Sequence, residues 1–495
     1  MIPVHRRSST PSRLRRVVLA SVLAAVACAA PEAPRPAEQP DAGGRAWLAG
    51  DHHIHSRFSV GWNDSTNPPT PILAGDARYP IPTNAEMARQ HGLAWMVATD
   101  HGGPNHSKVN LEMAYPELVQ SRGSVPEVIQ FYGMEFDPPG AEHASLIIPH
   151  SHHEHTSLYQ IEKRFSRRDS FPSDPARSTE PKMLEALGYM RDIDLPPVLI
   201  ANHPARSARD LGVYGANDPA ELRDWNDTAP QVAVGMEGAP GHQANALRRD
   251  GSIDSTGVRG GYGNHPTLGG FDQMTARLGG FWDSMLGEGR RWWITSTSDS
   301  HVNWRDGGND FWPGEYSKTY VFAERDYDDI LEGIRHGRVF VTTGDLLSEL
   351  YVTAQVELRG HRVSVPIGGS LEVPSGSDVT VTIRARDPAG ANHGGRTPSV
   401  ARVDLIVGEI TGPVTDRDAD TNPSTRVVRR FTAADWTRDG EYLTMTHTLR
   451  DVHHASYLRV RGTSTDQLEP EPDPRGEDPW TDLWFYSNPI FLPVR

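Results

Sequence analysis

Residues 47–55 read Trp-Leu-Ala-Gly-Asp-His-His-Ile-His, a short apolar run that leads directly into histidines. In an extended strand, residues two apart point to the same face, so His53 and His55 would present their imidazoles side by side. Imidazole nitrogen is a common ligand of divalent metals in proteins. The stretch therefore predicts a β-strand whose carboxyl end carries a metal-binding pair.

The same arrangement recurs up to about residue 342, where short apolar runs alternate with helix-like segments. We expect strands at 47–49, 94–98, 128–134, 145–148, 198–201, 232–236 and 293–297. Between them, residues 84–91 predict a helix with Asn84 as its N-cap and Gly92 as its stop, and the apolar stripe of residues 182–191 predicts another. The pattern indicates an α/β fold with a largely parallel sheet that closes into a barrel of about seven βα units.

Six of the seven expected strands lead into residues of metal-ligand type: His53 and His55, His101, Glu135, His203, Glu237, and Asp299 with His301. The fourth strand, 145–148, is instead preceded by His143, so either that histidine lies at the wrong end of the strand or the strand begins earlier than residue 145. In a βα barrel the carboxyl ends of the strands meet at one rim. We therefore expect a shared site for two or three divalent ions, with Glu135 and Asp299 offsetting the repulsion between the cations.

The motif order resembles that of the PHP (polymerase and histidinol phosphatase) superfamily from about residue 47 to residue 340. The matching motifs are Asp-x-His-x-His, Thr-Asp-His, a Glu after a strand, a spaced His, His-Pro and Ser-Asp-x-His. The resemblance implies a distorted (β/α)7 barrel with two or three metal ions. By matching motif it places His53, His55, Glu135 and Asp299 on the first ion, Glu135, His143 and His203 on the second, and His101 with His301 on the third. His and carboxylate ligands suit Zn, Mn and Fe alike.

One part of the family pattern is missing. Family members with three ions carry another His or Asp shortly after the His-x-His pair, whereas here the nearest candidate is Asp64. We therefore expect the third ion to be weak or absent. Candidate substrate contacts are Arg57, Arg206 and Glu237, and the histidines that could line the mouth of the pocket are His106, His242 and His265.

After residue 345 the sequence becomes rich in alternating apolar runs and turn residues. The expected strands are 350–358, 379–384, 403–407, 442–449, 457–460 and a closing segment 488–493. They predict a small antiparallel β-sandwich over 343–495, following a barrel over 46–342. This layout, with residues 336–342 and 487–490, is similar to that of the exported CehA/McbA-type metallohydrolases.

The first 45 residues predict an export signal and a linker. Five arginines precede an apolar run, 17–27, that is too short to span a membrane and ends at Cys28, the only cysteine. The setting resembles the lipobox of bacterial lipoproteins and implies a lipid anchor in the cell envelope or periplasm; the alternative is ordinary cleavage with Cys28 incidental. Residues 29–45 predict a flexible linker. A net charge of −15 without basic clusters beyond the first sixteen residues argues against a nucleic-acid partner.

The expected reaction is hydrolysis of a small anionic or ester-like substrate by water that the metal ions activate. Glu135 would bridge ions, and Asp299 or His301 would accept and relay the proton. A phosphoesterase is the first reading. A carboxylester, carbamate or amide hydrolase is the second, favoured by the CehA/McbA-like layout and by only four lysines, Lys108, Lys163, Lys182 and Lys318. A third interpretation is a non-catalytic surface protein in which the metal is structural. It is disfavoured because structural zinc needs only four ligands, fewer than are predicted here.

Overall fold

All seven strands expected before residue 342 are confirmed in the computed structural model, which describes residues 44–495. They are β1 (Ala46–Ile54), β4 (Trp95–Ala98), β5 (Ile129–Phe136), β6 (Ala144–Ile148), β7 (Val198–Ala201), β8 (Ala233–Ala239) and β9 (Trp293–Ser296). The predicted export signal, the anchor at Cys28 and the linker up to residue 43 lie outside the described residues.

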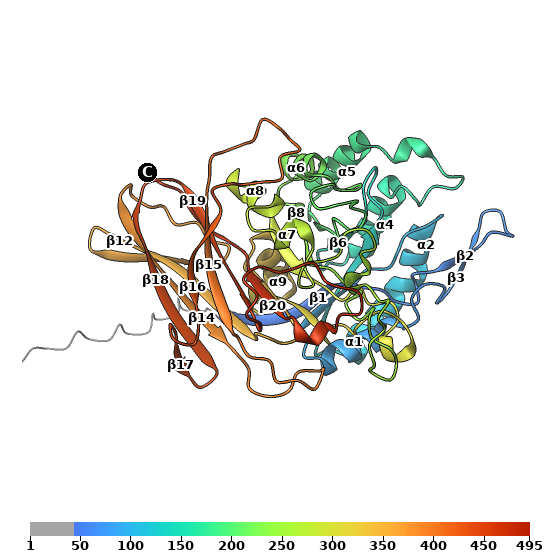
Figure 1. Ribbon diagram of the computed structural model, residues 1–495. Helices are drawn as coiled ribbons and strands as arrows, with labels where there is room; N and C mark the ends of the chain where they lie inside the picture. The colour runs from blue at the N-terminus through green and yellow to red at the C-terminus, as the bar shows by residue number, and fades with distance from the viewer. Residues whose placement is uncertain (1–43) are drawn as a thin grey trace, which may run out of the picture. The chain divides into compact units, whose positions relative to one another are not determined.

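A mixed sheet of 14 strands runs through the described part of the chain (Figure 1). Its hydrogen-bonded order is β16-β15-β19-β20-β11-β10-β1-β4-β5-β6-β7-β8-β9, and β21 pairs with β19. The additional strands are β10 (Ser317–Ala323), β11 (Val339–Thr343), β15 (Arg402–Glu409), β16 (Arg426–Phe431), β19 (Ser456–Thr463), β20 (Trp484–Ser487) and β21 (Ile490–Leu492). The seven predicted strands are consecutive in this order.

The prediction of a largely parallel sheet is wrong at β6. Strand β6 pairs antiparallel with both β5 and β7, whereas β1·β4, β4·β5, β7·β8 and β8·β9 are parallel. Because β6 runs in the opposite direction, its amino end lies beside the carboxyl ends of its neighbours. His143 directly precedes β6 and so reaches the same rim as Glu135 of β5 and His203 after β7. The reversed strand thus explains the position of a histidine that the parallel arrangement would have misplaced.

The first and last of the seven predicted strands, β1 and β9, approach each other at this rim. In the described residues the sheet order ends at β9, but Ile54 at the end of β1 forms an isolated parallel bridge with Ser300. The buried Asp51 carboxylate accepts backbone N–H groups from His53 at 3.0 Å and from Ser298 at 3.1 Å. These bonds hold the His-x-His segment against the residues that follow β9.

The helices are α1 (Ile81–Gln90), α2 (His106–Val109), α3 (Tyr115–Ser124), α4 (Glu154–Phe165), α5 (Glu180–Asp192), α6 (Pro219–Thr228), α7 (Gln273–Ala276), α8 (Phe281–Gly287) and α9 (Tyr327–Arg335). The helix predicted over residues 182–191 is confirmed as α5, which buries Met183, Leu187 and Met190. The predicted start of α1 is wrong, because the helix begins three residues earlier, with a proline in its first turn where no N–H partner is needed. Asn84 is therefore inside the helix, and its amide donates to the His55 carbonyl at 2.8 Å.

The predicted C-terminal strands are confirmed but divide between two sheets. A separate antiparallel sheet has the order β13-β12-β14-β18-β17, and the segments at 403–407, 457–460 and 488–493 belong to the large sheet. The bounds of the separate sheet are β12 (Glu349–Leu358), β13 (His361–Pro366), β14 (Ser377–Arg386), β17 (Thr437–Asp439) and β18 (Tyr442–Val452), and a hairpin is formed by β2 (Gly61–Asn63) and β3 (Thr70–Ile72). Val352 of β12 and Leu405 of β15 belong to one buried apolar cluster, so the two sheets share a core.

None of the described helices has the length and apolar character needed to cross a membrane.

Candidate metal centre

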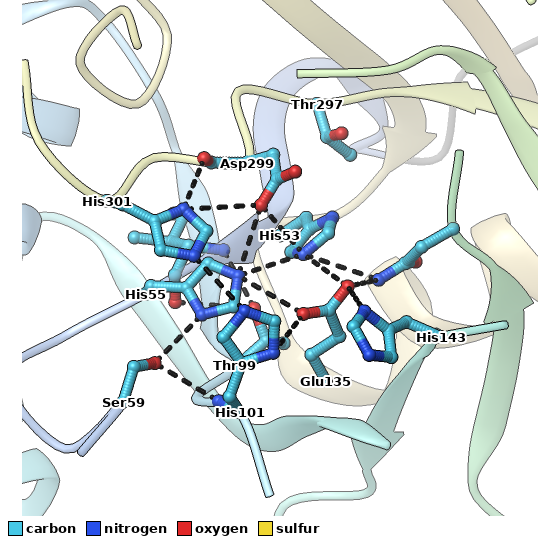
Figure 2. A network of polar contacts seen from close by, with 12 residues as sticks. His53, His55, Ser59, Thr99, His101, Glu135, His143, Thr297, Asp299 and His301 are labelled. Atoms are coloured by element: carbon cyan, nitrogen blue, oxygen red, sulfur yellow. Dashed lines mark hydrogen bonds and ion pairs between the residues drawn. The ribbon is translucent and has the colours of Figure 1, made fainter. Parts of the chain in front are cut away.

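The predicted ligands meet at the rim where β1, β5 and β9 end (Figure 2). The His53 Nε2 atom lies 3.1 Å from both Glu135 Oε1 and Asp299 Oδ1. The His55 Nε2 atom lies 3.0 Å from His53 Nε2 and 3.1 Å from Asp299 Oδ1. Four residues that are far apart in the chain thus point their ligand atoms at one small volume.

Glu135 lies at the centre of the cluster, between histidines from three other segments. Its Oε2 atom is 2.7 Å from His101 Nδ1, and its Oε1 atom is 3.1 Å from His143 Nδ1 and 3.2 Å from His203 Nε2. A carboxylate with both oxygens among imidazoles is suited to bridging two cations. The eighth predicted ligand, His301, lies with its Nε2 atom next to His101 Nε2. All eight predicted metal ligands are therefore brought together.

A further carboxylate, Asp76, accompanies the third group of ligands. The Nε2 atoms of His101 and His301 are 3.2 Å apart, and Asp76 Oδ2 lies 3.4 Å and 3.5 Å from them. Asp64, the nearest candidate in sequence, is exposed beside the β2–β3 hairpin. Asp76 was not predicted from the sequence because the hairpin separates it from His55. The chain returns to the cluster after β3, where the Asp76 N–H donates to the Ser59 carbonyl.

Several of the converging atoms are buried without a hydrogen-bond partner among the described residues. They are Glu135 Oε2, Asp299 Oδ1, His101 Nδ1 and His143 Nδ1. His101 Nδ1 and Glu135 Oε2 are only 2.7 Å apart, yet their orientation does not form a hydrogen bond. Buried polar atoms without partners are costly, and ligand atoms that face a common point are the donor arrangement a cation needs. The buried groups could therefore hold metal ions, for example at His53, His55 and Glu135.

The protonation states of the central groups also suit a cation. Burial alone would raise the pKa of Glu135, but the nearby His143, His101 and His53 outweigh it and hold the pKa well below its usual range. Burial, followed by the charges of His301 and His101, lowers the pKa of His55 well below its usual value. Metal ligands must be ionised carboxylates and neutral imidazoles, which are the forms that these two shifts favour. Despite burial, the charges of Asp299 and Glu135 raise the pKa of His53 well above its usual value, and Glu135 raises the pKa of His143 to about 10, so these two histidines would release a proton when a cation binds.

Glu237 lies behind the cluster rather than in front of it. Its Oε1 atom is 2.7 Å from His53 Nδ1 and accepts the Thr297 hydroxyl at 2.9 Å, while Oε2 accepts the His203 backbone N–H at 2.6 Å. The side chain is fully buried. A carboxylate bound to the second nitrogen of a ligating histidine orients that ring toward the metal. This placement favours an orienting role for Glu237 over the substrate contact that the sequence suggested.

A cavity of about 350 Å³ opens onto the cluster, and Arg206, His242 and Asp310 line it together with five of the predicted ligands, His101, Glu135, His143, Asp299 and His301. The predicted substrate contact Arg206 donates to Asp299 Oδ2 at 2.9 Å. Arg57 instead pairs with Glu117 and is absent from the described lining. His106 is buried against Glu162, and His265 faces the carbonyl of Pro266. Only Arg206 and His242 of these candidates reach the cavity.

A scan against protein-family models found no match to this chain, and a search of curated proteins found no relative.

Proposed function

We propose that this protein is a metal-dependent hydrolase that uses two or three divalent cations, Zn, Mn or Fe, to cleave phosphoesters. The observation that carries the proposal is the convergence of ligand atoms from His53, Glu135, Asp299 and their neighbours beside an open cavity, with Glu135 Oε2 and Asp299 Oδ1 buried without a hydrogen-bond partner among the described residues. A closed site for structural zinc needs four ligands and no cavity. The approach of the residues after β9 to the end of β1 supports a distorted (β/α)7 barrel of PHP type.

In this proposal His53, His55, Glu135 and Asp299 hold one cation, Glu135, His143 and His203 a second, and His101, His301 and Asp76 a third. When bound, the cations supply a water of lowered pKa and polarise the substrate oxygen. Glu135 would be a ligand shared by the first and second of these cations. Asp299, whose Oδ2 lies next to the cavity-lining Arg206, accepts the proton of the attacking water, with His301 beside it as the relay.

Arg206 supports an anionic substrate. It is the only Lys or Arg in the described lining of the cavity, and its Nε–H is buried without a hydrogen-bond partner. A guanidinium with a spare donor beside the reacting centre is suited to a phosphoryl oxygen. This arrangement favours the phosphoester over a neutral ester.

We expect Arg206→Met to raise KM for an aryl phosphate roughly 10- to 100-fold, the loss of one hydrogen bond between charged groups. The inhibition constant of a neutral aryl ester, used as a competitive inhibitor, should change little. Arg57→Met is the matched control, because Arg57 pairs with Glu117 outside the cavity, and it should keep wild-type kinetics. Equal losses on charged and neutral substrates would contradict the anion-binding role.

The alternative is a carboxylester, carbamate or amide hydrolase, favoured by the chain layout that is similar to CehA/McbA-type enzymes. An assay of metal-loaded protein on an aryl phosphate, a cyclic phosphodiester and an aryl carbamate separates the two, with His53→Ala as the inactive control. Turnover of phosphate esters alone is expected. Turnover of the carbamate alone would establish the alternative, and inactivity on all three would leave a metal-stabilised binding protein. Export, a lipid anchor at Cys28 and the lack of a nucleic-acid partner remain predictions from the sequence.

A further inference from the structure

His242, in the segment after β8, bridges two carboxylates beside the candidate metal centre. Its Nδ1 atom lies 2.5 Å from Asp310 Oδ1, and its Nε2 atom lies 3.1 Å from Asp299 Oδ2. Each ring nitrogen faces a carboxylate oxygen, which accepts but cannot donate a hydrogen bond. The ring therefore connects Asp310 to a predicted metal ligand.

Asp310 is itself held firmly by backbone groups. Its Oδ2 atom accepts the N–H of His301 at 2.7 Å and the N–H of Val302 at 3.0 Å, and the side chain is buried. One carboxylate thus holds both the His242 ring and the backbone that carries His301. The support behind His242 is rigid rather than a mobile surface contact.

The backbone around His242 is shaped for this contact. His242 has φ +54° and Asp299 has φ +48°, a left-handed conformation that residues other than glycine adopt at a cost. Gly241 packs directly against Asp299, since a Cβ added at Gly241 would lie 2.0 Å from the Asp299 Cβ. A larger residue at position 241 would push the two segments apart.

We propose that His242 is a positioning residue for Asp299. Supported by Asp310, it holds the Oδ2 atom, to which Arg206 also donates, and so aims the Oδ1 atom at the cations. The Oδ1 atom is the one that lies 3.1 Å from His53 Nε2 and from His55 Nε2 and has no hydrogen-bond partner among the described residues. The inference rests on the proposed metal site and goes beyond it, because it assigns a role to two residues outside the ligand set.

The test is a metal titration of the full-length protein with Zn²⁺ in competition with a chelator, which needs no turnover. His242→Leu should weaken the binding of one ion by roughly 10- to 100-fold, the usual effect of removing an outer partner of a ligand. The number of ions bound at saturation should not change. His242→Gln, whose amide N–H can still donate to Asp299, should recover most of the affinity, and the control His265→Leu should match wild type.

Each other result overturns the inference. Unchanged affinity in His242→Leu would remove the positioning role. Loss of one ion even at saturating Zn²⁺ would make His242 a ligand, and a His242→Gln variant as weak as His242→Leu would exclude donation to Asp299. A wild-type protein that binds no divalent ion would overturn the proposed function as well, whereas failure of the hydrolysis assays alone would leave the titration result valid.

Discussion

Replacing Glu135 with alanine is expected to abolish hydrolysis and lower the metal content of the purified protein. The Glu135 carboxylate lies within 3.2 Å of nitrogens from His53, His101, His143 and His203, so its removal would take away the ligand that we propose two cations share. The loss of turnover should exceed about 100-fold, the upper range for a residue that only supports a ligand. Metal content by elemental analysis and initial rates on the same sample measure both effects.

Glu142→Ala is the control for this prediction, because Glu142 is next to His143 in sequence but is not among the residues lining the cavity. It should retain wild-type metal content. If Glu135→Ala bound as many ions as wild type with equal affinity, Glu135 would not bridge them.

The second large effect concerns stability. Asp283 in α8 and Arg459 in β19 form a fully buried pair with two hydrogen bonds, at 2.9 Å and 2.7 Å. Tyr457 donates to the same carboxylate at 3.0 Å. Asp283→Ala leaves a guanidinium buried without its counter-charge, which should lower the free energy of unfolding by about 3–5 kcal/mol. Urea unfolding of the two proteins in the metal-free state measures the difference.

An exposed pair provides the comparison. Arg450 and Asp378 also form an ion pair, but both side chains are largely in solvent, so Arg450→Ala should leave the unfolding midpoint unchanged. A small effect of Asp283→Ala, similar to that of Arg450→Ala, would mean that the buried pair does not hold α8 to β19. Asp283 and Arg459 lie on opposite sides of the predicted domain boundary at residue 342. The unfolding experiment therefore also measures how much contacts across that boundary stabilise the protein.

The sequence alone predicted the strands that carry the candidate site and the side chains that come together there. Apolar runs of strand length located β1, β4 to β9, β15 and β19, because these strands are largely buried on both faces. Alternating apolar residues located β12 and β14, in which every second residue is buried. Seven of the eight predicted ligands follow those runs and His143 precedes the reversed strand β6, and the structure brings all eight to one rim. These candidate ligands are close to the strands in the sequence, so a local pattern was sufficient to predict them.

Only the tertiary structure decided the direction of β6, the return of Asp76 after the hairpin, and the positions of Arg57, Glu237 and His242. Strand direction and the division of the C-terminal strands between two sheets depend on which partners pair, and residues distant in sequence make that choice. The local sequence around an arginine or histidine in a loop does not reveal whether its side chain faces a cavity or an acidic residue. Its role is set by the contacts that folding creates.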